Sequence, residues 1–93
     1  MNPDPKPSDL KRDAVHLSPA LNVGKNGITD SLVEELREKL KQNKLIKVKI
    51  LKTAAIGSTE RKTIAEELSS RTGAQLIEVR GSNAVLYLGR RRK

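Results

Sequence analysis

Residues 45–51 are the segment that most constrains the fold, because apolar residues and lysines alternate along it. In an extended chain this alternation places three branched apolar side chains on one face of a β-strand and Lys47 and Lys49 on the other. A strand with one apolar face is stable only beside other strands and under a covering layer. The chain must therefore build a sheet with a second layer packed on it.

Helical periodicity precedes and follows this strand. In residues 30–42 four apolar side chains recur at helical spacing, and Thr29 is positioned as the N-cap. Residues 31–34 form a competing capping box that would begin the helix two residues later. We favour Thr29 because it keeps the helix N-terminus close to the preceding glycines. Residues 59–71 are predicted as another helix, with Gly73 at its C′ position.

Three further strands and one further helix complete the predicted order. They are expected at residues 8–17 (helix), 20–23, 75–80 and 84–88 (strands), with a turn at 81–83. Ile77 and Val79 are predicted to face inward, and the last two strands to form an antiparallel hairpin. The order α-β-α-β-α-β-β predicts an α/β fold, a two-layer sandwich with a four-stranded mixed sheet.

The composition predicts a small soluble protein. The chain has 93 residues, no cysteine and one histidine, which excludes a disulfide framework and thiolate zinc sites. No apolar run approaches the roughly 20 residues of a membrane span, and no signal peptide is recognisable, so we expect a cytoplasmic location. Residues 1–7 are expected to form a flexible Pro-rich arm, residues 8–89 one folded domain, and residues 90–93 a basic tail.

The net charge of +8 is unevenly distributed along the chain. Residues 1–30 hold equal numbers of acidic and basic side chains, so the whole excess lies in residues 31–93. A small, strongly basic domain typically meets a polyanion, and nucleic acid is the usual one. The alternative is a basic surface that has no such partner.

No catalytic constellation is recognisable in the sequence. His16 stands alone and is interpreted as a partly buried residue near the end of the first helix. The glutamate pairs at 34–35 and 66–67 are neighbours on helices, so the two side chains of each pair diverge by about 100° and do not converge on one substrate. We therefore expect no enzyme activity, no metal site and no cofactor.

Gly24, Lys25, Asn26 and Gly27 form a glycine-bounded loop between a predicted strand and a predicted helix. The two glycines let the backbone turn tightly and approach a ligand closely. Unpaired N–H groups at the start of the next helix favour an anion at this place, and Lys25 adds a positive charge. The same pattern also occurs in ordinary strand-to-helix turns, so the motif alone does not decide.

The remaining cations and the scarcity of aromatic residues limit the mode of binding. The predicted fold can gather Lys47, Lys49, Arg80 and the tail, although lysines on a strand face also protect it against aggregation and a basic tail is often merely solvated. Tyr87 is the only aromatic residue, so bases cannot be stacked on a platform of rings. What remains is contact with a nucleic-acid backbone, which is salt-dependent and has little sequence preference.

Several separated segments resemble the CRM domain, also called the YhbY-like family. They match in order and spacing from about Ser8 to Gly89. The segments are Val15–Pro19, Val23–Thr29, Leu45–Lys49, Glu60–Lys62, Ala65–Leu68, Thr72–Ala74 and Val85–Tyr87. The resemblance implies an RNA-binding domain with a fold like the C-terminal domain of translation initiation factor 3.

The resemblance also implies which residues meet RNA. In that family the loop between strand and helix, which resembles the KH-domain loop, is implicated in RNA contact. This assigns Gly24, Lys25, Asn26 and Gly27 to the interface. We extend the assignment to basic residues expected around the loop, which are Lys11, Arg12, Lys47, Lys49, Arg61 and Arg80.

Members of the family are associated with precursors of the large ribosomal subunit in prokaryotes and with group II intron splicing in plant organelles. We therefore expect a stand-alone, monomeric protein that contacts the backbone of structured RNA, namely ribosomal RNA during large-subunit assembly. One alternative is an adaptor that docks on a protein partner of a ribonucleoprotein through an exposed strand face or edge. Another is a general chromatin-type binder, which would bind duplex DNA and RNA equally.

Overall fold

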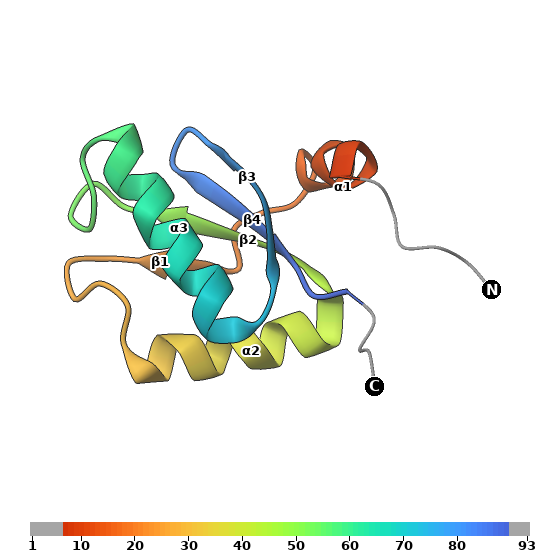
Figure 1. Ribbon diagram of the computed structural model, residues 1–93, viewed down its shortest axis with the longest axis horizontal. Coiled ribbons are helices and arrows are strands. Elements are labelled where there is room, and N and C mark those ends of the chain that lie inside the picture. Colours follow the sequence, from red (N-terminus) through yellow and green to blue (C-terminus); the bar gives the residue numbers. More distant parts are fainter. Residues whose placement is uncertain (1–6, 90–93) are drawn as a thin grey trace.

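The computed structural model describes residues 7–89 of the chain. Its elements are α1 (Pro7–Ala14), β1 (Leu21–Val23), α2 (Asp30–Asn43), β2 (Leu45–Ile50), α3 (Ser58–Thr72), β3 (Gln75–Arg80) and β4 (Asn83–Tyr87) (Figure 1). The order is the one predicted. The predicted tail and the predicted arm up to residue 6 lie outside the described residues. No helix in the described part is long and apolar enough to cross a membrane.

The four strands form one mixed sheet in the order β1-β2-β4-β3. β1 runs parallel to β2, whereas β4 pairs antiparallel with both β2 and β3. The parallel pair follows from the α2 crossover, and β3 and β4 form the predicted hairpin. β2, with the clearest alternation in the sequence, lies inside the sheet between β1 and β4, where its apolar face has neighbours on both sides.

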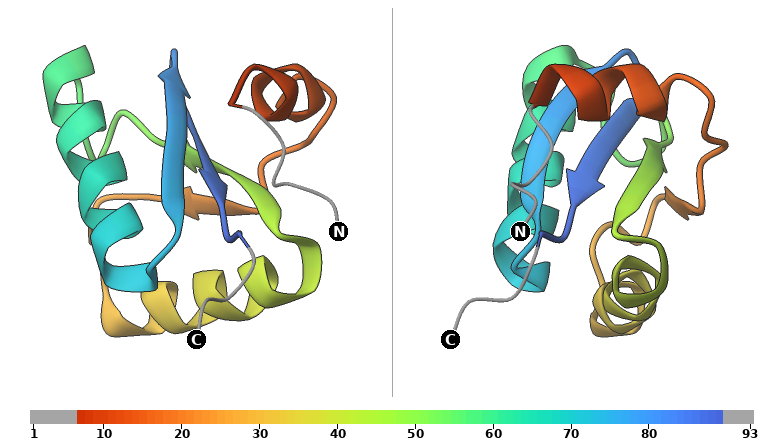
Figure 2. Two further views of the ribbon diagram at one scale, coloured as in Figure 1. Left: turned by 45° about the vertical axis from the view of Figure 1, so that its right-hand side comes forward. Right: turned by 90° about the vertical axis from the view of Figure 1, so that its right-hand side faces the viewer.

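Helices α2 and α3 cover one face of the sheet, and the main core lies between them and the strands (Figure 2). The fully buried side chains of this core include Leu36 and Leu40 from α2, Val48 from β2, and Leu68 from α3. The short helix α1 lies against the opposite, outer face, where it contacts β2, β3 and β4. The predicted sheet-and-helix sandwich is confirmed, and α1 adds a small cover on its outer side.

Helix α1 is shorter than predicted. Leu10 and Ala14 are buried as expected, but the helix ends at Ala14 and Leu17 is exposed. The N–H groups of residues 15–17 bond to carbonyls three residues earlier, which tightens the last turn instead of continuing the α-helix. His16 lies in this turn and is exposed, so the prediction of partial burial was wrong.

Strand β3 contains an irregularity that the sequence did not reveal. Leu76 pairs with Leu86 and Glu78 pairs with Val85, so Ile77 is an extra residue without a partner in the register. Such a β-bulge shifts the alternation of side chains by one position. Leu76 and Val79 pack against the core, and the prediction that Ile77 faces inward was wrong.

The helix ends follow their local sequences. Thr29 is the N-cap of α2, and its Oγ1 accepts a hydrogen bond from the Leu32 N–H at 3.1 Å, as predicted in preference to the box at 31–34. Gly73 ends α3 in the left-handed conformation, with φ of +79°, and its N–H donates to the Ser69 carbonyl. These caps fix where the chain leaves each helix and returns to the sheet.

Candidate nucleic-acid interface

The glycine loop, residues 24–27, is a tight turn at the end of β1. The Gly27 N–H donates to the Gly24 carbonyl at 2.9 Å, which places Lys25 and Asn26 at the exposed tip. Gly27 has φ of +68°, a conformation that a residue with a Cβ adopts only at a cost. The backbone of this turn therefore requires glycine at its second end.

Gly24 differs from Gly27 in this respect. A Cβ added to Gly24 would lie 3.8 Å from Leu51 Cδ1 and 3.9 Å from Thr53 Oγ1, which are ordinary contacts. These distances also show that the glycine loop lies against the segment after β2. The Leu51 N–H donates to the Val23 carbonyl at 2.9 Å and ties the two segments together. The fold thus tolerates a methyl group at residue 24, where the side chains of Leu51 and Thr53 would contact it.

The start of α2 offers fewer donors to the loop than the sequence suggested. Thr29 Oγ1 already accepts the Leu32 N–H, so one predicted anion-binding donor is occupied by the protein itself. Asp30 adds a fully exposed carboxylate in the first turn, 3.8 Å from Arg71 Nη1. The positive end of the helix dipole is therefore partly offset by an acidic side chain, and Lys25 carries more of the attraction for an anion.

Four polar residues on the outer face of the sheet form one row across all four strands. Asn22 on β1 pairs with Lys49, Lys49 pairs with Asn83, and Asn83 pairs with Arg80 on β3. We call these four residues the polar row. It spans three interstrand spacings, or about 14 Å. Because Asn22 stands two residues before Gly24, one end of the polar row adjoins the glycine loop.

Three connections meet at this end of the sheet. The glycine loop and the segment 51–57 follow the carboxyl ends of the parallel strands β1 and β2 (Figure 1). The β3–β4 turn joins them, because the Ile50 N–H donates to the Ser82 carbonyl. Two further exposed cations stand here, Lys52 in the loop and Lys62 in α3. Neither was predicted, although Lys52 lies only two residues after the carboxyl end of β2.

The segment 51–57 is held in shape by two charged residues of α3. The Glu60 carboxylate accepts hydrogen bonds from the Gly57 N–H at 3.0 Å and the Ile56 N–H at 3.2 Å, and these bonds lower the pKa of Glu60 below its usual value. Arg61 Nη1 donates to the Ile56 carbonyl at 2.9 Å. Of the predicted interface residues, Arg61 is therefore chiefly an anchor for this loop.

The structure brings together only some of the predicted interface residues. Lys25, Lys49 and Arg80 lie at the glycine-loop end of the sheet. Lys47 is one row farther along β2, and its Nζ donates to the Leu17 carbonyl at 3.0 Å, so it fastens the segment after α1. Lys11 and Arg12 belong to α1, which lies at the other end of the molecule from the glycine loop (Figure 1), and Arg12 pairs with Asp9 at 3.0 Å.

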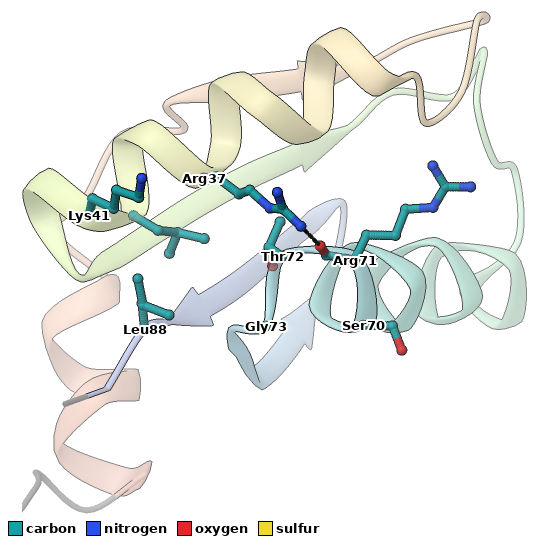
Figure 3. A pocket seen from close by; sticks show the side chains of 8 residues that line it. Arg37, Lys41, Ser70, Arg71, Thr72, Gly73 and Leu88 are labelled. Carbon is teal, nitrogen blue, oxygen red and sulfur yellow. Dashed lines mark hydrogen bonds between the residues drawn. The ribbon is translucent and has the colours of Figure 1, made fainter. Parts of the chain in front are cut away.

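A groove lies between α2 and α3. It has a volume of about 510 Å³ and is lined by cations of both helices. Arg37 Nη2 donates to the Arg71 carbonyl at 2.9 Å, closing the C-terminal end of α3 (Figure 3). Arg71 in turn pairs with Glu67 at 3.1 Å, and Lys41 pairs with Glu38 at 3.7 Å. Lys41 and Arg71 are thus paired with acidic neighbours on their own helices, and Arg37 is held by a backbone carbonyl of α3.

Metal and catalytic chemistry find little support in the described residues. Between residues 7 and 89 no group of three or more His, Cys, Asp or Glu side chains is arranged to hold a metal ion. The exposed His16 lies in the turn after α1, away from the glycine loop. The arrangement offers instead lysines and an arginine on the outer face of the sheet, with a backbone turn at the margin.

The chain is similar to known proteins along nearly its whole length. The family model of the CRS1 / YhbY (CRM) domain matches residues 5–88. The Bacillus subtilis protein named "Probable RNA-binding protein YqeI" is 33% identical over 78 residues, which cover 84% of this chain and 78% of that protein. An RNA-binding protein of Haemophilus influenzae is 32% identical over 78 residues, covering 84% of this chain and 76% of that protein.

A solved structure shares the fold. The solution structure of the Staphylococcus aureus protein SAV1595 superposes with a TM-score of 0.79 at 29% sequence identity. The match covers 92% of this chain and 86% of that one. The predicted α/β class with a four-stranded mixed sheet is therefore confirmed by both the topology and this neighbour.

Proposed function

Because the chain belongs to the CRS1/YhbY (CRM) domain family, we propose that it binds RNA through the glycine loop and the polar row. The relatives named as RNA-binding proteins support the partner, and the arrangement of charge supports the surface. The more specific proposal is that the chain contacts the backbone of structured RNA, namely ribosomal RNA during large-subunit assembly, as a monomer in the cytoplasm.

The observation that carries the proposal is the segregation of charge in the fold. Residues 15–29 and 44–57, which include β1, β2 and the loops at their ends, contain five lysines and no aspartate or glutamate. A polyanion that approaches this side meets lysines without acidic neighbours in the same segments. Phosphate contacts of this kind release counterions and supply affinity without reading the sequence.

The glycine loop is suited to a close approach of the RNA backbone. Lys25 and Asn26 are exposed at its tip, and residue 24 has no side chain although the fold would accept a methyl group. A bare backbone lets a phosphate or sugar come within hydrogen-bonding distance of the peptide groups. The half-buried Tyr87 lies at the far end of β4 from the polar row, so ring stacking plays no part in this contact.

The test compares Lys25→Ala with Lys41→Ala, a matched loss of one positive charge on α2. Binding to a ribosomal RNA fragment is measured by fluorescence anisotropy over a range of salt concentrations. We expect Lys25→Ala to weaken binding and to reduce the salt slope by about one unit or slightly less, because one phosphate contact is lost. Lys41→Ala should change neither quantity. Equal affinities of wild type and Lys25→Ala would contradict the role of the loop.

The identity of the RNA needs a separate experiment. Crosslinking in cells followed by sequencing of the bound RNA should recover ribosomal RNA of the large subunit. Recovery of messenger or transfer RNA alone would overturn the ribosomal part of the proposal while leaving RNA binding in place. A competition with duplex DNA distinguishes an RNA-binding protein from a general nucleic-acid binder. From a general binder, duplex DNA of equal length would displace the RNA.

A further inference from the structure

A small cavity of about 130 Å³ lies on the outer face of the sheet, beside the C-terminal end of α1. Its walls include the apolar side chains of Val15 and Val85. Its polar groups come from Lys47, Glu78, Arg80 and Asn83. Val15 is 57% exposed and stands at the margin, so the cavity opens to solvent beside an uncovered apolar side chain.

The two acceptors of this cavity differ: among the described residues one has no partner, and the other has only a long ion pair. Asn83 Oδ1 is buried and makes no hydrogen bond to any described residue. The Glu78 side chain is only 17% exposed, and the Arg80 Nε beside it is 3.7 Å away, which is too long for a hydrogen bond. Buried polar groups are normally paired with protein or ordered water, so these acceptors can take donors from a ligand that enters the cavity.

The chemistry of the cavity fits the edge of a nucleobase better than a phosphate. A carboxylate at the wall repels a phosphate but accepts two adjacent N–H groups side by side. Guanine presents such a pair at N1 and N2, and its O6 accepts from a cation such as Lys47 or Arg80. Hydrogen bonds to the base edge are also how unstacked bases of single-stranded RNA are recognised.

The cavity is continuous with the proposed RNA surface. Arg80 and Asn83 belong both to the cavity and to the polar row. The other end of the polar row adjoins the glycine loop, about 14 Å away by the strand spacing. An RNA strand held at the loop and crossing Lys49 therefore arrives at the cavity with its next bases free to turn inward.

From these observations we infer that the cavity is a base-reading subsite, which receives one unstacked guanine of the bound RNA. The inference rests on the proposed function and deepens it, since it adds a sequence preference to a surface that otherwise contacts only the backbone. Glu78 is the residue that selects guanine, and Asn83 supplies a second acceptor. The cations of the cavity bind the carbonyl side of the base.

The test uses the full chain and short uridine-rich oligonucleotides that carry one guanine, inosine or adenine at the same place. Wild type should bind the guanine oligonucleotide about tenfold more tightly than the adenine one, with inosine between them because it lacks the N2 amino group. Glu78→Gln should abolish this preference, so that the guanine and adenine oligonucleotides bind equally tightly. Asn83→Ala should reduce the preference. Glu66→Gln, which removes an exposed carboxylate on α3, is the matched control.

The outcomes separate this inference from the proposed function. Equal affinity of wild type for all three oligonucleotides overturns the subsite and leaves RNA binding in place. If Lys25→Ala binds all three oligonucleotides as tightly as wild type does, the proposed role of the glycine loop is overturned instead. If Glu78→Gln does not fold, NMR spectra of the wild-type protein test the subsite instead. Amide shifts at Glu78 and Val85 on addition of the guanine oligonucleotide support the subsite, whereas shifts confined to the glycine loop overturn it.

Discussion

The strand-and-loop side of the molecule and its helical side differ in how they handle charge. Helices α2 and α3 together hold seven acidic and six basic residues, and several of these pair with each other along one helix. Residues 15–29 and 44–57 hold five lysines and no acidic residue. The chain therefore does not spread its positive charge over the surface but leaves it uncompensated on one side.

The difference has a structural origin. On a helix, residues three or four apart are neighbours, so alternating glutamates and lysines neutralise one another locally. On a strand, the neighbours come from other strands, and in the polar row Lys49 and Arg80 have asparagines rather than acids directly opposite them. The comparison agrees with the proposal that RNA binds the strand-and-loop side rather than the helical side.

The largest effect is expected from the helical side, and on stability. Leu36 of α2 is fully buried in the core, so Leu36→Ala should lower the free energy of unfolding by about 2–5 kcal/mol. The change is measured by urea denaturation. At urea concentrations where the variant is still folded, its RNA affinity should equal that of wild type. A stable Leu36→Ala variant with lost RNA binding would break the comparison, since it would place the interface on the helices.

An intermediate effect is expected within the glycine loop itself. Gly27→Ala should cost about 1 kcal/mol of stability, because residue 27 has φ of +68°. Gly24→Ala should leave stability within about 0.5 kcal/mol of wild type, since its Cβ makes ordinary contacts. Thermal unfolding measures both. Gly24→Ala should nevertheless weaken RNA binding several-fold, and wild-type affinity in that variant would show that no backbone approach occurs at this glycine.

The smallest effect concerns the pH dependence of stability. Hydrogen bonds from Gly57 and Ile56 lower the pKa of Glu60 from its usual 4.5, so the ionised carboxylate stabilises the fold. This contribution is fully present above pH 4.5 and is lost as the pH falls through the lower, folded-state pKa. Glu60→Gln should therefore be less stable than wild type at about pH 7, and the gap should close at about pH 3. A gap that does not depend on pH would contradict the ionised cap.

Local signals in the sequence were sufficient for most of the elements. Thr29 caps α2 and Gly73 ends α3 because both act through their own backbone neighbours. The alternation in residues 45–51 predicted β2, because this pattern too lies within a few consecutive residues. The predictions failed where residues far apart in the chain determine the local structure. The bulge at Ile77 depends on the register of β3 with β4. The early end of α1 is followed by a tightened turn, and the Leu17 carbonyl in that turn accepts a hydrogen bond from Lys47 Nζ.

The candidate site was harder to predict than the fold. The glycine loop and Lys25 were identified because they are contiguous in the sequence. Asn22 and Asn83 were missed because neutral side chains far apart in the chain give no signal until cross-strand pairing aligns them. Lys11 and Arg12, by contrast, were included on charge alone, and the fold places them on α1 at the other end of the molecule.

The sequence by itself determined the order of helices and strands, the caps, the basic character and the glycine loop, because each depends on residues near one another in the chain. Only the tertiary structure decided which cations share a surface, which of them bond to the protein's own backbone, and that a cavity with an unpaired acceptor opens beside α1. Strand order and register set these relations, and both result from packing the whole chain at once.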